Sequence, residues 1–175
     1  NKEFATKKAE QFNVKAESVD DILSNNDIGL IINLTIPSAH KEIIVKSLNA
    51  GKHCFSEKPL AMNMEEGLEI QKLSNEKKLY VGCAPDTFLG GGIQKSKELV
   101  EKNILGKISL GNAIFAFPGV QSYHPNPEPW FAKKAGGPVI DMGPYYLTAL
   151  VNLLGPAKKV TGSIMEGVKR RTIGI

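Results

Sequence analysis

The sequence predicts an α/β fold, in which a partial doubly wound parallel sheet is followed by part of an α+β domain with an open antiparallel sheet. Up to about residue 84, apolar runs of strand length alternate with helical patterns at short spacing, which is typical of parallel strands joined by helices. After Pro85 the pattern changes to a long helix, an extended run and a loop rich in proline and aromatic residues. We therefore expect two parts, residues 1–84 and 85–175.

Two helices are expected before the first strand. Apolar side chains recur at helical spacing at Ala5, Ala9 and Phe12, so they share one helical face. Ser18 and Asp21 have the spacing of a capping box, which predicts the start of a short helix. The polar run 25–27 is a turn signal and ends that helix.

Three strands and two helices then alternate. The strand-like runs are 28–34, 52–55 and 79–83, and the helical patterns are 38–48 and 64–78. Run 28–34 is apolar on both faces, which favours the middle of a sheet covered by helices. Gly51 is placed to end the first helix, and Asn63 is placed to cap the second.

The second part is expected to contain two helices and two strands. The helices are a long one over 92–103 and one introduced by residues 136–138 and halted at 155–156. The strands are 107–117 and the first part of another over 158–165. Between them, the loop 118–135 is a candidate lid or substrate wall, although Trp130 and Phe131 in it are equally interpreted as a small core of the loop.

Composition indicates an ordinary soluble class. Hydrophobic residues make up 42% and charged residues 23%, and the formal net charge is +4, with basic and acidic residues interspersed rather than gathered in a stripe. We expect no nucleic-acid partner. Apolar runs are shorter than the roughly 18–20 residues that span a bilayer, and the start lacks a signal-peptide pattern, so we expect no membrane association and a cytoplasmic location. Cys54 and Cys83 lack metal or redox spacing and are interpreted as buried free thiols.

The strongest chemical signal is the run Ser56-Glu57-Lys58-Pro59. It follows a short strand, so Lys58 is expected at the carboxyl edge of the sheet, where ligands bind in open parallel sheets. The following proline restricts the backbone of Lys58 and gives its side chain a fixed direction. A partly desolvated lysine there is suited to donate a proton or hydrogen bond to a carbonyl oxygen. An isolated Glu-Lys-Pro would instead be interpreted as a surface turn.

A second run supports the chemical interpretation. Asn33-Leu34-Thr35-Ile36-Pro37-Ser38-Ala39-His40 lies one strand and helix upstream, also at the carboxyl end of a strand. Together, the two runs resemble the second half of the nucleotide domain in the Gfo/Idh/MocA oxidoreductase family, which implies a partial Rossmann-like, dinucleotide-binding domain. In that family the first run lines the nicotinamide side of the cofactor, and the lysine faces the substrate. The resemblance thus implies cofactor contacts from Asn33, Thr35, Pro37, His40, Glu57, Lys58 and Pro59.

The resemblance continues at Gly136-Gly137-Pro138-Val139-Ile140-Asp141-Met142-Gly143-Pro144-Tyr145. Asp141 matches the active-site aspartate of the family, and Tyr145 stands where a histidine is usual. A spacing of four residues would place both on one helical face. Tyrosine still donates a hydrogen bond, but its high pKa makes it a poor proton shuttle. Without the resemblance, Asp141 would be interpreted as a helix-start acid and Tyr145 as a packing residue.

The resemblance implies an NAD(P)-dependent dehydrogenase or reductase that acts on a sugar, inositol or related polyol and forms a homo-oligomer. The catalytic residues would be Lys58, Asp141 and Tyr145. The sequence contains no G-x-G-x-x-G loop, since Gly90-Gly91-Gly92 has the wrong spacing. We therefore expect the chain to cover the middle of the family's architecture, and to be inactive and unable to bind NAD or NADP by itself.

Two other functions remain open. One is a binding domain that keeps the fold without turnover, which the missing glycine loop favours. The other is a metal-dependent hydrolase using His40, His124 and Asp141, although their spacing matches no metal motif and we expect no metal. His53 lies inside a predicted strand and is assigned no role, and His124 is only a weak candidate for the substrate wall.

Overall fold

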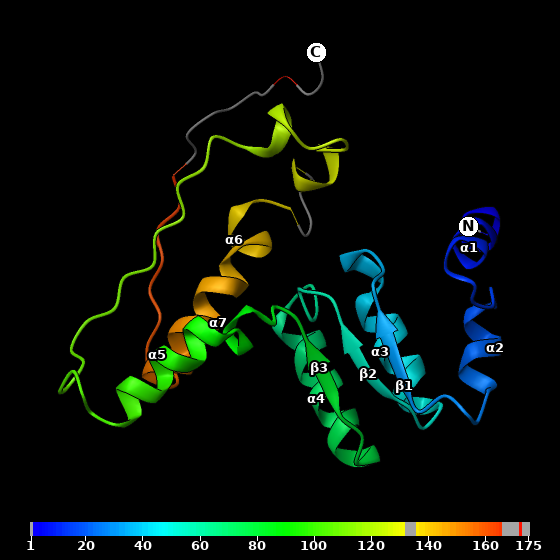
Figure 1. Ribbon diagram of the computed structural model, residues 1–175, viewed down its shortest axis with the longest axis horizontal. Coiled ribbons are helices and arrows are strands. Elements are labelled where there is room, and N and C mark those ends of the chain that lie inside the picture. Colours follow the sequence, from blue (N-terminus) through cyan, green and yellow to red (C-terminus); the bar gives the residue numbers. More distant parts are fainter. Residues whose placement is uncertain (1, 132–135, 166–171, 173–175) are drawn as a thin grey trace.

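The computed structural model describes residues 2–131, 136–165 and 172. Its centre is a three-stranded parallel sheet with the order β1-β2-β3, seen on the right of Figure 1. The strands are β1 (Leu30–Asn33), β2 (His53–Ser56) and β3 (Val81–Cys83), joined by helices α3 (His40–Asn49) and α4 (Met64–Lys77). A short 3₁₀ turn, η1 (Pro37–Ala39), precedes α3. The predicted alternation of strands and helices is confirmed.

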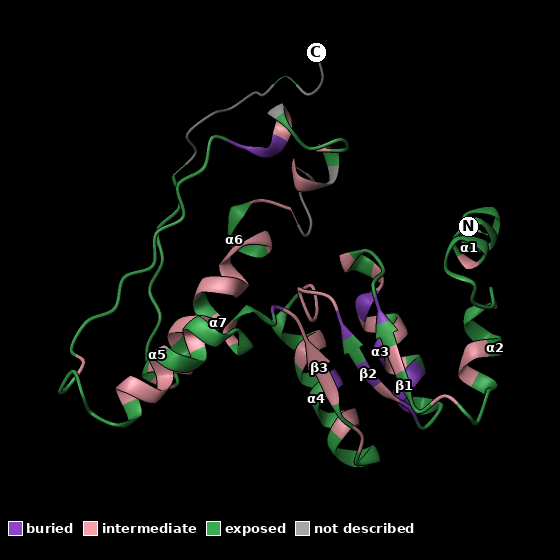
Figure 2. Ribbon diagram, in the orientation of Figure 1, coloured by how far each residue is buried: buried purple, intermediate pink, exposed green. Residues whose placement is uncertain are grey.

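One face of this sheet is covered, and it carries the small core. Ile31, Asn33, Cys54 and Ser56 alternate along β1 and β2 toward the buried side, where α3 and α4 pack. The fully buried apolar side chains are Ile44, Leu48, Cys54 and Ile70. Figure 2 shows most of the buried residues around β1, β2 and α3, and a separate buried stretch in the loop at Val120. The core therefore fixes the two strands whose carboxyl ends carry the predicted site.

The prediction that run 28–34 lies in the middle of a covered sheet is wrong for the described residues. β1 is the edge strand, and Leu30 and Ile32 on its open face are 50% and 55% exposed. The physical reason is that no described segment pairs with the outer edge of β1. Helices α1 (Lys2–Phe12) and α2 (Val19–Ser24) lie beyond that edge in Figure 1 and bury none of their residues.

The predicted helix ends are confirmed in detail. Ser18 and Asp21 form both hydrogen bonds of the capping box at α2. The Asn63 side chain accepts a hydrogen bond from the Glu66 amide at the start of α4. Gly51 has φ of +75° after α3, a conformation that costs glycine little. These helix ends could be predicted because each depends on residues only a few positions apart in the sequence.

Lys52, directly before β2, holds the turn that precedes β1. Lys52 is only 3% exposed, and its Nζ donates hydrogen bonds to the carbonyl oxygens of Asn25 at 2.6 Å and Ile28 at 2.7 Å. A charged group this deeply buried requires such partners. Lys52 is thus a structural residue that fixes the entry to β1.

The second part consists of helices and extended chain. Helix α5 (Gly91–Glu101) packs on α7 (Gly143–Leu154), and α7 packs on the 3₁₀ turn η2 (Thr87–Leu89) at the border with the first part. The loop between them contains two more 3₁₀ turns, η3 (Val120–Ser122) and η4 (Glu128–Phe131). Within the described residues, no helix is both long and apolar enough to cross a membrane.

Two predicted strands, and with them the antiparallel sheet, are not formed by the described residues. Segments 107–117 and 158–165 contain no strand; they run as extended chain on the left of Figure 1. A β-strand requires backbone hydrogen bonds to a neighbouring strand, and the sheet topology gives these segments none. Their apolar side chains are largely exposed, with Ile114 at 82% and Ile164 at 97%.

The predicted helix after residue 136 is divided in two. A short helix α6 (Pro138–Asp141) is followed by the cap residue Met142, and α7 begins at Gly143. Asp141 and Tyr145 therefore belong to different helices and do not share one helical face, so this prediction is wrong. Pro144 at the start of α7 lacks the amide that would continue the hydrogen bonds of α6.

Candidate active site

The carboxyl ends of β1 and β2 are held together by buried polar side chains. Asn33 is 2% exposed and Ser56 is fully buried, and the Asn33 amide donates a hydrogen bond to Ser56 Oγ at 3.1 Å. Asn33 Oδ1 accepts hydrogen bonds from the backbone amide of Thr35 at 3.2 Å and from its hydroxyl at 2.7 Å. Asn33 thus shapes the turn that carries the exposed Thr35.

His40 ties the same turn to the residues after β2. The imidazole is fully buried; its Nδ1 lies 2.7 Å from the Pro59 carbonyl oxygen, and its Nε2 lies 2.9 Å from the Thr35 carbonyl oxygen. Both ring nitrogens are therefore occupied by backbone. His40 connects the 33–40 run to the Lys58–Pro59 turn from inside the protein.

Lys58 extends from this edge to the second part of the chain. Its side chain is only 15% exposed. The ammonium donates a hydrogen bond to the Asp141 carbonyl oxygen at 2.8 Å and forms an ion pair with Asp141 Oδ1. It also lies 5.5 Å from the centre of the Tyr145 ring, within cation–π range. The structure thus brings the three predicted catalytic residues together, although Lys58 and Asp141 are 83 positions apart in the sequence.

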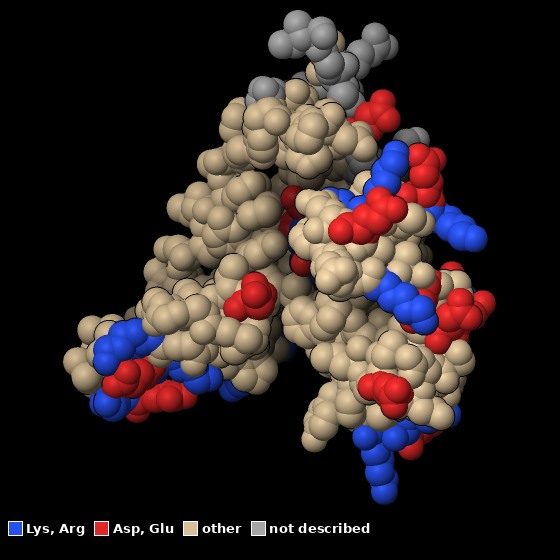
Figure 3. All heavy atoms as spheres, turned by 45° about the vertical axis from the view of Figure 1, so that its right-hand side comes forward, with Lys and Arg blue, Asp and Glu red and all other residues tan. Residues whose placement is uncertain are grey.

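The Asp141 carboxylate is shared between two donors. While Oδ1 faces Lys58, Oδ2 accepts a hydrogen bond from the indole Nε1 of Trp130 at 2.7 Å. Asp141 is the single charged residue between positions 136 and 157, in a region of apolar and small side chains. Figure 3 shows charges of both signs interspersed over the visible face, next to a broad area that has neither. Asp141 is thus the only carboxylate that residues 136–157 can offer to the Lys58 ammonium.

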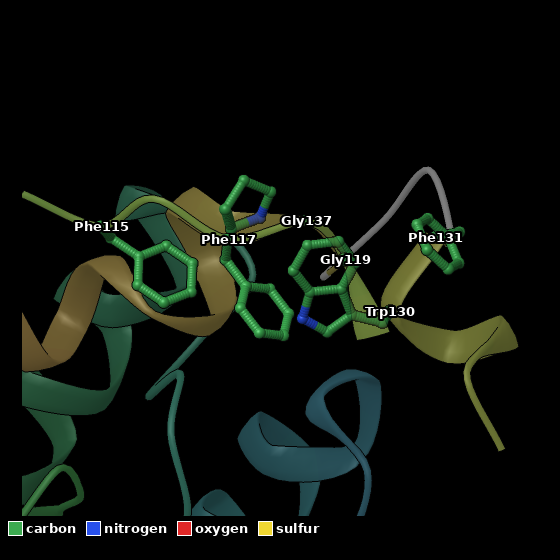
Figure 4. Close-up of a pocket in the computed structure, with 8 residues that line it drawn as sticks. Phe115, Phe117, Gly119, Trp130, Phe131 and Gly137 are labelled. Carbon is green, nitrogen blue, oxygen red and sulfur yellow. The ribbon is translucent and has the colours of Figure 1, made fainter. Parts of the chain in front are cut away.

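Two cavities lie beside this cluster. One, of about 230 Å³, lies between the chain after Lys58 and the helices α6 and α7, lined by Pro59, Ala61, Met62, Asn63, Ile140 and Pro144. The other, of about 370 Å³, is aromatic and is shown in Figure 4. Its lining includes Phe115, Phe117, Trp130 and Phe131, with Gly137 at its edge. Trp130 therefore borders the larger cavity with its ring and contacts Asp141 with its nitrogen.

Glu57 lies beside the cluster rather than in it. Its carboxylate accepts a hydrogen bond from the Lys58 amide at 3.0 Å. Burial raises the pKa of the nearby Cys83 thiol from 9.0 to about 11, and the negative charges of Glu57 and Cys54 add to that shift. Both cysteines are free, Cys54 buried and Cys83 half-buried. Cys83 is thus a neutral thiol at physiological pH, as expected of a thiol away from cations.

The residues of the metal hypothesis are not brought together. His40 is occupied by two carbonyls, while His124 is exposed in the loop and its Nδ1 accepts a hydrogen bond from the Asn126 amide at 3.0 Å. Across residues 2–131, 136–165 and 172, no group of three or more His, Cys, Asp or Glu side chains is arranged to hold a metal ion. The described chain therefore gives the hydrolase hypothesis no support.

Comparison with known families follows the same division of the chain. Residues 1–84 match the model of an oxidoreductase family with an NAD-binding Rossmann fold, and residues 93–172 match the GFO/IDH/MocA C-terminal domain. The chain belongs to the Gfo/Idh/MocA oxidoreductase family. Its parallel sheet is accordingly part of a Rossmann-like NAD-binding domain.

Relatives within the Gfo/Idh/MocA family include enzymes with named substrates. A D-xylose dehydrogenase of Paenarthrobacter nicotinovorans is 25% identical over 87% of this chain and 40% of that protein. A scyllo-inositol 2-dehydrogenase (NADP(+)) of Bacillus subtilis is 24% identical over 84% of this chain and 40% of that protein. Among solved structures, levoglucosan dehydrogenase in complex with NADH and levoglucosan has a TM-score of 0.58 and 26% identity, covering 62% of this chain and 30% of that one. The chain thus spans about 40% of the length of these curated relatives.

The hydrogen bond from Trp130 to Asp141 was not predicted from the sequence. The sequence predicts Trp130 either as part of a lid or substrate wall or as part of a small core of the loop, and in the structure it packs edge-on against Phe131 with ring centres 5.2 Å apart. Its hydrogen bond to Asp141 joins residues 11 positions apart. A tryptophan that is at least partly buried usually finds an acceptor for its N–H, so the one tryptophan of the chain, near a lone aspartate, was the available signal.

Proposed function

We propose that this chain provides the substrate side of the active site in an oxidoreductase that transfers a hydride between NAD or NADP and a sugar, inositol or related polyol. The observation that carries the proposal is the Lys58–Asp141 ion pair beside the Tyr145 ring. It joins the carboxyl edge of the parallel sheet to the second part of the chain, and ligands bind at such edges. Relatives in the family with named sugar and inositol substrates support the substrate class.

Lys58 is the group that stabilises charge on the reacting oxygen. An ammonium has three N–H donors, and two of them face Asp141, which leaves one for an alcohol or carbonyl oxygen of the substrate. The side chain is 15% exposed, so its charge acts in a partly dehydrated site where electrostatic effects are stronger than in water. In the reduction direction, Lys58 donates to the carbonyl oxygen as it becomes an alcohol.

Asp141 and Tyr145 orient the lysine and the substrate. The Asp141 carboxylate holds the ammonium from one side and retains lone pairs that can accept a substrate hydroxyl. The Tyr145 ring lies against the cation, and its hydroxyl can donate to a substrate oxygen. A tyrosine with this arrangement orients the substrate, whereas the proton transfer belongs to Lys58.

The residues at the carboxyl edge suit the nicotinamide end of the cofactor. The turn between β1 and α3 exposes Thr35 while Asn33 and His40 fix its backbone from beneath. Thr35, Pro37, Glu57, Lys58 and Pro59 are then the residues that would contact NAD(P), and Asn33 and His40 would hold them in place. When bound, NAD(P) would supply or accept the hydride.

The aromatic cavity is the proposed place for the rest of the substrate. Its volume of about 370 Å³ falls within the roughly 300–1,000 Å³ typical of small-molecule sites. Its described lining consists of aromatic residues, glycine and proline, which suits the C–H-rich faces of a neutral sugar or polyol. The division into residues 1–84 and 85–175, and assembly into a homo-oligomer, are parts of the same proposal.

The alternative is a domain of the same fold that binds without turnover. The absence of a G-x-G-x-x-G run from the sequence favours it, because that loop holds the pyrophosphate at a helix start. An intact Lys58–Asp141 pair favours catalysis, since a domain that only binds has no need for it.

Turnover of the full-length protein separates the two functions. Formation of reduced nicotinamide would be followed with xylose, inositol and anhydrosugar substrates, with NAD and with NADP. Asp141→Asn keeps the shape but loses the charge, and Glu128→Gln is the matched control on an exposed acid. We expect turnover that falls by about tenfold or more in Asp141→Asn and is unchanged in Glu128→Gln. No turnover with any substrate, or equal turnover in both variants, would favour the non-catalytic alternative.

A further inference from the structure

Among the described residues, the indole nitrogen of Trp130 has one hydrogen-bond partner, which is the carboxylate of the candidate site. Its Nε1 donates to Asp141 Oδ2 at 2.7 Å, while Lys58 faces Oδ1 of the same carboxylate. An indole N–H only donates hydrogen bonds, and it does not ionise near neutrality. Trp130 therefore has no part in proton transfer, but it determines which way the carboxylate faces.

The backbone holds Trp130 and Asp141 in a common frame. The Trp130 amide donates to the Pro127 carbonyl oxygen at 3.1 Å, and the Trp130 carbonyl oxygen accepts from the Gly137 amide at 2.7 Å. The Gly137 carbonyl oxygen in turn accepts from the Asp141 amide at 3.0 Å. Gly137 has φ of +86°, a backbone conformation that residues other than glycine rarely adopt. The loop, the start of α6 and Asp141 are thus connected by consecutive hydrogen bonds.

Aromatic packing restricts the indole ring as well. The Trp130 and Phe131 rings are 5.2 Å apart at 78°, an edge-to-face contact that aromatic pairs favour. In Figure 4 the indole lies between the rings of Phe117 and Phe131. Trp130 lines the aromatic cavity, and its packing against Phe131 helps to direct its nitrogen to Asp141.

We propose that Trp130 is a positioning residue, whose N–H fixes the plane of the Asp141 carboxylate so that Oδ1 faces the Lys58 ammonium. The terminal torsion of an aspartate is broad, so the contact with Lys58 alone leaves the carboxylate free to rotate. A charge-assisted hydrogen bond on the second oxygen removes that freedom. The proposal deepens the proposed function and rests on it for the catalytic importance of Asp141, whereas the positioning itself is a property of this chain.

The chain contains one tryptophan, so its indole N–H gives a single, assignable signal in a ¹H–¹⁵N spectrum. Asp141→Ala removes the acceptor, and Glu128→Gln is the control in the same 3₁₀ turn. We expect the indole signal to shift, and its exchange with solvent to accelerate by about tenfold or more, in Asp141→Ala. It should be unchanged in Glu128→Gln. An indole signal that does not respond to Asp141→Ala would overturn the proposal.

The positioning itself is measured at Lys58. In protein labelled with ¹⁵N-lysine, Lys58→Met identifies the Lys58 ammonium signal. Trp130→Phe keeps an aromatic ring but removes the donor, and Trp130→His restores a ring N–H. We expect solvent exchange of the Lys58 ammonium to accelerate by about tenfold in Trp130→Phe and to return toward the parent value in Trp130→His.

An ammonium signal that is the same in Trp130→Phe and the parent chain would show that Trp130 only packs. If Trp130→Phe loses its folded circular dichroism, Trp130→His decides alone: protection like that of the parent supports positioning, and lost protection in a folded protein contradicts it. Neither signal depends on turnover. A full-length protein without oxidoreductase activity would thus refute the proposed function and leave these results unchanged.

Discussion

Replacement of His40 by leucine tests whether this residue acts as an internal tie or as a cofactor contact. The imidazole is fully buried between the carbonyl oxygens of Thr35 and Pro59, at 2.9 Å and 2.7 Å. Leucine fills a similar volume, so the main loss is polar. At least one ring nitrogen carries a proton, and a lost hydrogen bond that leaves a carbonyl oxygen unpaired costs about 1–3 kcal/mol.

We therefore expect His40→Leu to lower the free energy of unfolding by about 1–3 kcal/mol. In urea, with a slope of about 2 kcal/mol/M, the midpoint of unfolding followed by far-UV circular dichroism should fall by roughly 0.5–1.5 M. His124→Leu is the control, because His124 is exposed and such changes stay within about 0.5 kcal/mol. A His40→Leu midpoint equal to that of the control would refute the assignment of His40 as an internal tie.

Three further outcomes follow from other contacts. Lys52→Met should lower the free energy of unfolding by about 1.5–3 kcal/mol, because it removes charge-assisted hydrogen bonds to two carbonyls; the exposed Lys72→Met should have no measurable effect in the same urea titration. Burial raises the pKa of Cys83 to about 11, so the unfolded chain loses this thiol proton first. The contribution of the neutral thiol to stability is thus present below pH 9 and is lost as pH rises toward 11. Over that pH window, the free energy of unfolding should fall less steeply in Cys83→Ala than in the parent chain. Finally, β1 is an edge strand with Ile32 55% exposed, so the chain should self-associate in light scattering, and Ile32→Lys should reduce that association; a monomeric parent chain would contradict this expectation.

The first part of the fold was predictable because its signals are local. Strand-length apolar runs, the Ser18 capping box and the Asn63 cap each depend on residues within a few positions. The position of β1 at the sheet edge was not predictable, since run 28–34 indicates only that both its faces are apolar. The extended segment 107–117 has the composition of a strand, but strand formation depends on a partner elsewhere in the chain.

The candidate site was predictable in its residues but not in its geometry. The resemblance selected Lys58, Asp141 and Tyr145, and the structure brings them together. The sequence predicts that Asp141 and Tyr145 meet on one helical face, whereas the helix break at Met142 places them in different helices. Trp130 and Lys52 were missed because their partners are backbone or side-chain oxygens that no spacing rule connects to them.

The central claim is that Lys58 stabilises the reacting oxygen and contributes little to holding the cofactor. Lys58→Met in the full-length protein keeps most of the stem and removes the donor, and Lys72→Met is the matched control at an exposed position. Steady-state turnover and a fluorescence titration with NADH would be measured on both variants. We expect turnover to fall by roughly 100-fold or more in Lys58→Met, with an unchanged dissociation constant for NADH. Near-normal turnover would contradict the catalytic role, and weakened NADH binding with unchanged turnover would assign Lys58 to the cofactor instead.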